Sequence, residues 1–240
     1  MLNRLLLFLC LFISGCAVRP DFRTYIADSP QQAFQALEER YASLESFKTD
    51  VVLRLSGEMG AVDLKGRIDF DRVEGWKIVL RGPLGVRVVS IKSVQDGFQI
   101  NSRDGQVLML KPGESLEIPE FNITISDITA IATLIVPTVK LDIQHHWVIK
   151  DAEIANPGHL SLVEQASGSN DSLFISLDYN PVLPRTDEYW SSGNQKYKRQ
   201  FFYDRKSGMH PAEIELAVDN FTLNIRFESL HMVFDKANNN

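Results

Sequence analysis

The sequence predicts a mainly β protein, in which one strongly curved antiparallel sheet has its apolar face covered by helices. The first observation is that, from residue 49 onward, apolar side chains recur at every second position, which is the period of a strand. The second is that turn signals such as Asp96-Gly97 and Asp104-Gly105 separate about ten or eleven such segments. The third is that only two segments have helical spacing. A sheet with one apolar and one charged face must bury the apolar face, and these helices are available to cover it.

The composition is that of an ordinary globular chain. Of its 240 residues, 44% are hydrophobic and 23% are charged, which is typical of a globular chain of one or two domains. The chain has 25 basic and 31 acidic residues, a net charge of -6. Proteins that bind nucleic acid concentrate basic residues on one face, so this balance argues against a nucleic-acid partner.

The N-terminus is typical of a secretory signal. Arg4 precedes an apolar run over residues 5–13, which is shorter than the roughly 20 residues that span a bilayer. The run ends in Ile13-Ser14-Gly15-Cys16, which resembles the bacterial lipobox, whose cysteine becomes acylated. We therefore expect residues 1–15 to be a lipoprotein signal peptide and Cys16 to carry acyl chains such as palmitate. The alternative is an ordinary signal peptide with a chance cysteine.

The residue after the cysteine predicts the membrane. In Gram-negative lipoproteins an aspartate at this position retains the protein in the inner membrane, whereas Ala17 resembles the outer-membrane class. The second cysteine, Cys10, lies inside the signal, so the mature chain can form no internal disulfide. We expect an outer-membrane lipoprotein on the periplasmic face, with residues 16–28 as a lipidated tether and residues 29–240 as a single domain.

Two helices are predicted. Ser29 can cap the first, and Pro30 suits its first position. Its apolar stripe is Ala33, Phe34, Leu37, Tyr41 and Leu44. The second covers residues 126–136 before Pro137, with Ile128, Ile131, Leu134 and Ile135 on one face. Between the strands, residues 178–196 contain two prolines and Ser191-Ser192-Gly193, which predict a long loop projecting from the rim.

Motifs for catalysis are absent from the sequence. It has no G-x-S-x-G elbow, no phosphate-binding glycine loop and no H-E-x-x-H motif. His145-His146 is the only histidine cluster, and neighbouring residues in a strand point to opposite faces, so the pair is not expected to chelate a metal. We expect no enzyme activity, no cofactor and no metal site.

Two positions stand out against this background. Leu84 lies in the Gly82-Pro83-Leu84-Gly85 turn, where an apolar side chain is exposed to solvent unless it contacts a lipid or a partner. The alternative is that Leu84 folds back onto the core. Arg199 falls on the apolar register of its strand. It could bind a lipid headgroup or a carbonyl of the helical lid, but a bulge, or a guanidinium that reaches out past the rim, is the favoured interpretation.

These features resemble the LolA/LolB-like periplasmic lipoprotein carriers, and most closely their lipid-anchored outer-membrane branch, the LolB-like proteins. The lipobox, the first helix, the segment of residues 76–93, the helix ending at Val136-Pro137 and the closing strands to Phe227 occur in matching order. The resemblance implies an unclosed, strongly curved antiparallel β-barrel with lid helices over an apolar cavity. The departures are a shorter lid region over residues 118–136 and the 178–196 loop.

The resemblance also implies a function without covalent chemistry. LolB-like proteins accept lipoproteins from a soluble LolA-like carrier and place them in the outer membrane, and their protruding-loop leucine looks like Leu84, flanked by Pro83 and Gly85. The candidates for the cavity and lid are Leu53, Leu55, Ile68, Phe70, Ile78, Leu80, Val88, Phe98, Ile128, Ile131, Leu134, Ile135 and Arg199. We expect a monomer whose ligand is the acyl chains of lipoproteins. The alternatives are a binding module for another lipid or glycolipid, and a structural envelope lipoprotein without cargo.

Overall fold

The computed structural model describes residues 26–118, 123–139, 147–156, 159–166, 171–179, 181–205, 207, 210–218 and 220–235. These residues contain helices α2 (Pro30–Ser43) and α3 (Ile128–Leu134) and the 3-10 turn η1 (Pro83–Gly85). The main sheet consists of β1 (Leu44–Gly57), β2 (Gly60–Asp71), β3 (Gly75–Arg81), β4 (Arg87–Val94), β5 (Gly97–Ser102), β6 (Val107–Leu110), β9 (Trp147–Asn156), β10 (His159–Ala166), β11 (Ser172–Tyr179), β12 (Val182–Ser191), β13 (Asn194–Phe202), β14 (Glu213–Val218), β15 (Phe221–Phe227) and β16 (His231–Phe234). A separate pair consists of β7 (Leu116–Ile118) and β8 (Ile123–Ile125).

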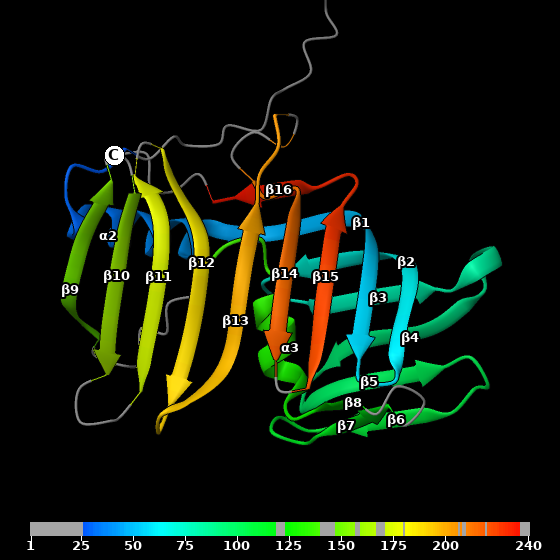
Figure 1. The fold of residues 1–240 in the computed structure, drawn as a ribbon. Helices are drawn as coiled ribbons and strands as arrows, with labels where there is room; N and C mark the ends of the chain where they lie inside the picture. Colours follow the sequence, from blue (N-terminus) through cyan, green and yellow to red (C-terminus); the bar gives the residue numbers. More distant parts are fainter. Residues whose placement is uncertain are drawn as a thin grey trace, which may run out of the picture.

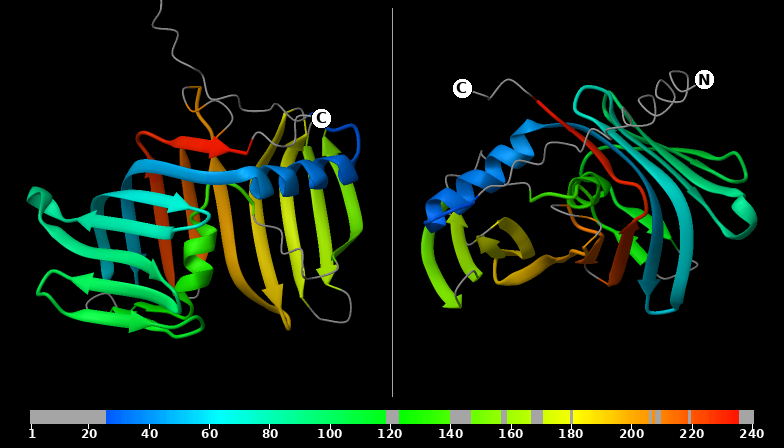
Figure 2. Two further views of the ribbon diagram at one scale, coloured as in Figure 1. Left: turned by 180° about the vertical axis from the view of Figure 1, so that it is seen from behind. Right: turned by 90° about the horizontal axis from the view of Figure 1, so that it is seen from above.

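The main sheet is antiparallel, has 14 strands and is not closed (Figure 1). Its order is β6-β5-β4-β3-β2-β1-β15-β14-β13-β12-β11-β10-β9, and β16 pairs with the start of β1. Pairing of β1 with β15, in register from Val51 and Phe227 to Ser56 and Thr222, joins the two halves of the chain. Seen from above, the sheet curls into an open trough (Figure 2). The fold class that the alternation predicts is therefore confirmed.

Helix α2 begins where its sequence predicts. Ser29 accepts a hydrogen bond from Gln32 N at 3.3 Å, and Pro30 is the first helical residue. The helix lies over the half of the trough that is formed by β9–β12 (Figures 1 and 2), with Ala33 and Leu37 buried. At its other end, Leu44 N donates to Tyr41 O, and Arg72 donates to the carbonyl oxygens of both Tyr41 and Leu44.

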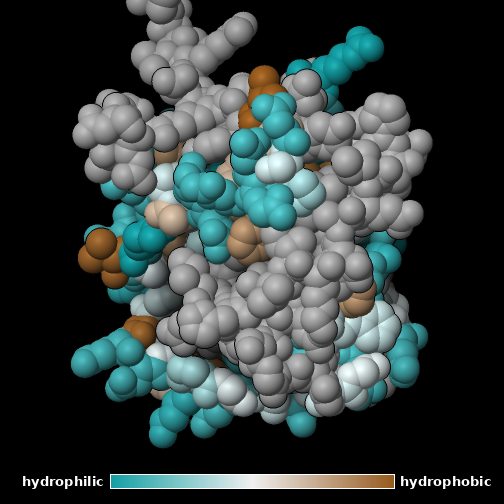
Figure 3. Space-filling model, turned by 90° about the vertical axis from the view of Figure 1, so that its left-hand side faces the viewer, coloured by the Kyte–Doolittle hydropathy of each residue, from teal (hydrophilic) through white to brown (hydrophobic). Residues whose placement is uncertain are grey.

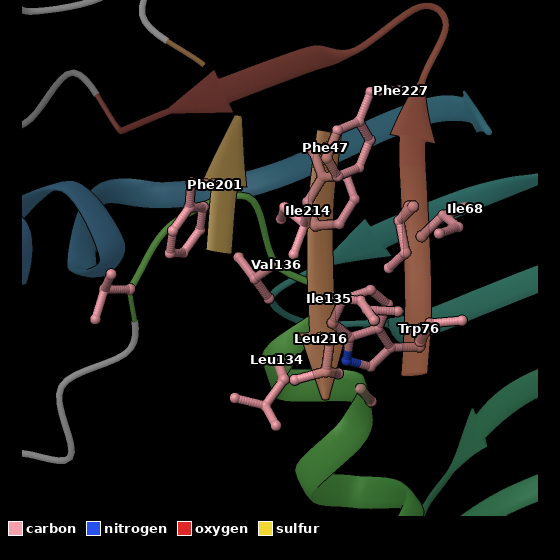
Figure 4. Close-up of a cluster of buried hydrophobic side chains, with 14 of the residues drawn as sticks. Phe47, Ile68, Trp76, Leu134, Ile135, Val136, Phe201, Ile214, Leu216 and Phe227 are labelled. Carbon is pink, nitrogen blue, oxygen red and sulfur yellow. The ribbon is translucent and has the colours of Figure 1, made fainter. Parts of the chain in front are cut away.

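The core lies on the concave side of the sheet. Phe47, Phe70 and Trp76 form an aromatic cluster with ring centroids 4.8 to 5.6 Å apart. Ile214 and Leu216 face the same interior from β14 and are fully buried (Figure 4). Both halves of the sheet thus contribute to one apolar core.

The 178–196 segment is not a loop, which corrects the prediction. It is the end of β11, all of β12 and the start of β13, joined by a tight hairpin turn. Ser192 and Gly193 have φ of 51° and 78°, the left-handed values that a two-residue hairpin turn requires. Pro184 lies where the pairing of β11 and β12 shifts register, a bulge at which a strand tolerates proline.

The surface at the β9 edge differs from the core. Where described residues are visible on this side, they are mostly hydrophilic with isolated hydrophobic ones (Figure 3). Neither of the two helices within the described ranges has the length and apolar character that crossing a bilayer requires.

Candidate functional site

The concave face of the trough collects most of the side chains that the sequence predicts for a cavity and its lid. From the sheet, the buried ones are Leu53, Ile68, Ile78, Leu80 and Phe98. From the lid segment, they are Ile128, Leu134 and Ile135. Leu55, Phe70 and Ile131 are partly buried and pack against the same core. Apart from Val88, these side chains share one buried apolar face, and their role in a lipid cavity stays a prediction.

Val88 does not face the core. Val89 packs against it instead, whereas the Val88 side chain is 37% exposed. Val86, Val88 and Val89 are all apolar, so the sequence does not show which of them face the core. The pairing of β3 with β4 also shifts register between Leu80 and Arg81, which changes which residues of β4 share a face. Val88 lines an open pocket of about 670 Å³, together with Ser102, Arg103, Asp104, Gln106, Glu117 and Ile118.

The lid segment lies within the curve of the sheet. Helix α3 sits inside the trough in both views of Figure 2, and Leu134, Ile135 and Val136 are part of the buried cluster drawn in Figure 4. The helix is shorter than the predicted 126–136, because residues 126 and 127 before it and residues 135 and 136 after it are not helical. In this conformation, lid side chains occupy apolar space on the concave side.

Arg199 is buried at 1% exposure, which overturns the interpretation that its guanidinium reaches out past the rim. Its Nε donates to Asp187 Oδ1 at 2.8 Å, and its Nη2 donates to Asp187 Oδ2 at 2.7 Å. Nη1 donates to the carbonyl oxygens of Leu134 at 2.7 Å and Val136 at 3.2 Å. The carbonyl contact that the sequence left as the less favoured alternative is thus present, and it ties the lid segment to β13.

Two further groups complete the surroundings of Arg199. Its guanidinium carbon lies 4.6 Å from the centroid of the Phe201 ring. The Tyr197 hydroxyl lies 3.4 Å from Asp187 Oδ2, and burial, followed by the Asp187 charge, raises the Tyr197 pKa. Burial lowers the pKa of Arg199. The charge of Asp187 and the hydrogen bonds to it act in the opposite direction, and the pKa of Arg199 lies above its usual value. Arg199 is therefore positively charged.

Leu84 is 100% exposed at the tip of the turn between β3 and β4, so it does not fold back onto the core. This turn projects beyond the sheet at the right of Figure 1. Gly85 N donates to Gly82 O at 3.1 Å, and Leu84 has φ 66°, so it holds a position that type II turns give to glycine or asparagine. A left-handed backbone costs a non-glycine residue roughly 1–2 kcal/mol. Leu84 is both strained and unpacked.

Comparisons with known proteins rest on structure, because no protein-family model and no curated protein matches the sequence. A LolA superfamily protein from Nitrosomonas europaea has a TM-score of 0.54 at 14% identity, covering 87% of this chain and 95% of the other. A domain described as an outer membrane lipoprotein-sorting protein from Vibrio parahaemolyticus has a TM-score of 0.53 at 12% identity, and the match covers 86% of this chain and 92% of the other. A DUF1329 family protein from Desulfovibrio piger has a TM-score of 0.56 at 10% identity, and the match covers 88% of this chain and 95% of the other.

The chain has the LolA-superfamily fold. The similarity extends over most of each chain, so it concerns the whole fold and not one part of it. Within this LolA-superfamily fold, the described residues contain no group of three side chains placed to hold a metal ion.

Sequence reasoning missed Asp187, which lies in the segment interpreted as a loop. An available signal was Arg199 itself, since a cation on the apolar face of a strand needs a carboxylate partner on a neighbouring strand. Asp187 and Arg199 are direct cross-strand partners. Cys16 and His145-His146 lie outside the described residues of the LolA-superfamily fold, so their predicted roles are not tested by it.

Proposed function

We propose that this protein is an outer-membrane lipoprotein, anchored through Cys16, that binds the acyl chains of other lipoproteins within its trough and delivers them to the membrane at Leu84. A LolA-like carrier is the proposed donor. The observation that carries the proposal is the side chain of Leu84, which is fully exposed and backbone-strained at a turn that projects from an apolar trough. Such a side chain weakens the fold in water, whereas a membrane gives it a favourable environment.

The cargo explains why a protein is needed for the transfer. Three acyl chains hold roughly 40 methylenes, and exposing them to water costs on the order of 30 kcal/mol. A carrier that keeps them against apolar side chains removes most of that barrier. The reaction makes and breaks no covalent bond.

The Arg199 contacts provide the proposed gate. They hold the carbonyls of Leu134, the last residue of α3, and of Val136, so α3 leaves the trough only when these hydrogen bonds break. Acyl chains then take the place of lid side chains such as Leu134 and Ile135 against the sheet. The area of apolar surface that is buried changes little in this exchange, so its free-energy cost lies in the broken hydrogen bonds of Arg199.

Replacing Leu84 with Glu tests the proposal. Burying one leucine side chain contributes about 2 kcal/mol, so we expect Leu84→Glu to slow the transfer of a triacylated lipoprotein to vesicles by at least about thirtyfold. In cells depleted of the native copy, the same variant should leave lipoproteins missorted.

Val73→Glu is the matched control. Val73 is 93% exposed in the turn between β2 and β3, at the opposite end of β3 from Leu84. We expect it to transfer lipoproteins at the unsubstituted rate. Normal sorting by the Leu84 variant, or equal losses in both variants, would contradict a role for this turn in delivery.

A further inference from the structure

Three basic side chains lie side by side on neighbouring strands, next to the turn that carries Leu84. Lys65 on β2 is the cross-strand partner of Arg81 on β3, and Arg81 is the partner of Arg87 on β4. All three side chains are exposed. Arg81 and Arg87 also bracket the turn, so the exposed Leu84 and Val86 project from between two cations.

This basic row works against the stability of the sheet. Like charges directly opposite each other on neighbouring strands are destabilising. On β2, other charged side chains have partners of opposite sign, since Asp63 pairs with Arg54 and Asp69 with Arg67, although Lys77 and Lys92 are a second like-charged pair at the other end of β3 and β4. Within the described part of the chain, no member of the basic row forms an ion pair, and Arg81 Nη1 donates a hydrogen bond to Gly85 O at 3.2 Å.

The overall charge makes the row more distinctive. The whole chain has a net charge of -6, so an anionic surface repels it on average. A local group of cations beside apolar side chains is the pattern of a segment that lies in a membrane interface, where the apolar groups enter the bilayer and the cations contact headgroups.

We propose that Lys65, Arg81 and Arg87 form a binding surface for anionic phospholipid headgroups, which orients the molecule so that Leu84 meets the bilayer. The inference rests on the proposed function only in taking the Leu84 turn as the face toward the membrane. Its occupant is an anionic bilayer and not an acidic protein, because the exposed apolar tip between the two arginines needs an apolar medium as well as negative charge.

Vesicle binding tests the basic row without any lipoprotein cargo. The mature chain, residues 16–240, carries Cys16→Ser so that no acyl chain anchors it, and it is floated with phosphatidylcholine vesicles that contain or lack phosphatidylglycerol. Each basic residue near an anionic surface contributes about fivefold to binding, so Arg81→Gln with Arg87→Gln should weaken binding to the anionic vesicles roughly thirtyfold. High salt should remove the difference.

The matched control lies on the same two strands. Lys77 and Lys92 are exposed cross-strand partners on β3 and β4, so Lys77→Gln with Lys92→Gln makes the same change in net charge away from the turn. We expect it to bind like the unsubstituted chain. Arg81→Lys with Arg87→Lys keeps the charge without the guanidinium contact to Gly85, and it should retain most of the binding.

Three outcomes would overturn the inference: equal losses in the two glutamine pairs, failure of the lysine pair to retain binding, or binding that ignores phosphatidylglycerol. Failure of the proposed function gives a different result. In that case Leu84→Glu leaves lipoprotein transfer intact while binding to anionic vesicles still depends on Arg81 and Arg87.

Discussion

Leu84 shows at the scale of one residue how function and stability conflict. Its side chain gains nothing from the fold, and its φ of 66° suits glycine or asparagine. We therefore expect Leu84→Asn to raise the free energy of unfolding by about 1 kcal/mol, because asparagine tolerates the left-handed region. Urea denaturation measures the change. A loss of stability of similar size would show that Leu84 packs against the protein in solution.

The Arg199 and Asp187 pair gives a second prediction at this scale. Both side chains are at most 1% exposed, so removing one leaves the other charge buried without its partner. Arg199→Met should cost about 3–5 kcal/mol of unfolding free energy, whereas Arg199→Met combined with Asp187→Leu should recover most of the loss. If the double variant is as unstable as Arg199→Met alone, the loss of stability comes instead from the missing hydrogen bonds to Leu134 and Val136.

At the scale of the element, Gly66 permits the close approach of β2 and β3. A Cβ at Gly66 would lie 2.4 Å from the backbone oxygen of Val79, which cannot move without disturbing the ladder. Glycine inside a strand marks such an approach. We expect Gly66→Ala to destabilise the fold by about 3 kcal/mol or more, measured by thermal unfolding. Gly105→Ala is the comparison at a turn: no atom lies within 4 Å, so the expected loss is only the roughly 1–2 kcal/mol that a φ of 87° costs alanine.

The elements also show what sequence can and cannot predict. Strands β1, β3, β5, β14 and β15 bury residues at every second position on one face, and their alternation predicts them. Strands β2, β4 and β13 are also predicted, although their burial alternates less regularly. Strands β9 and β10 are missed because their pairing shifts register at two places, and each shift changes which residues share a face. Strand β12 is missed because Pro181, Pro184 and Ser191-Ser192-Gly193 are typical of a loop, although Pro184 lies at a bulge and Ser192-Gly193 forms a hairpin turn.

At the scale of the whole molecule, the open trough matters more than any single contact. The order of strands leaves β6 and β9 at its two edges, and α2 and α3 lie on the concave side (Figure 2). Alternation predicts this curved sheet and its covered face. The depth of α3 in the trough could not be predicted, because it depends on the contact of Arg199 with Leu134 and Val136, residues more than sixty positions earlier in the chain.

Fluorescence quenching of Trp76 tests most directly whether acyl chains enter the trough. Trp76 lies in the buried cluster that also contains Ile135, whereas Trp190 is partly exposed and packs against the exposed Phe174. Two proteins are compared, each keeping one of these tryptophans while Trp147 and the other are replaced by phenylalanine. A lipopeptide with brominated acyl chains should quench Trp76 saturably and leave Trp190 unchanged. Unquenched Trp76 at saturating lipopeptide, or equal quenching of both, would contradict acyl binding in the trough.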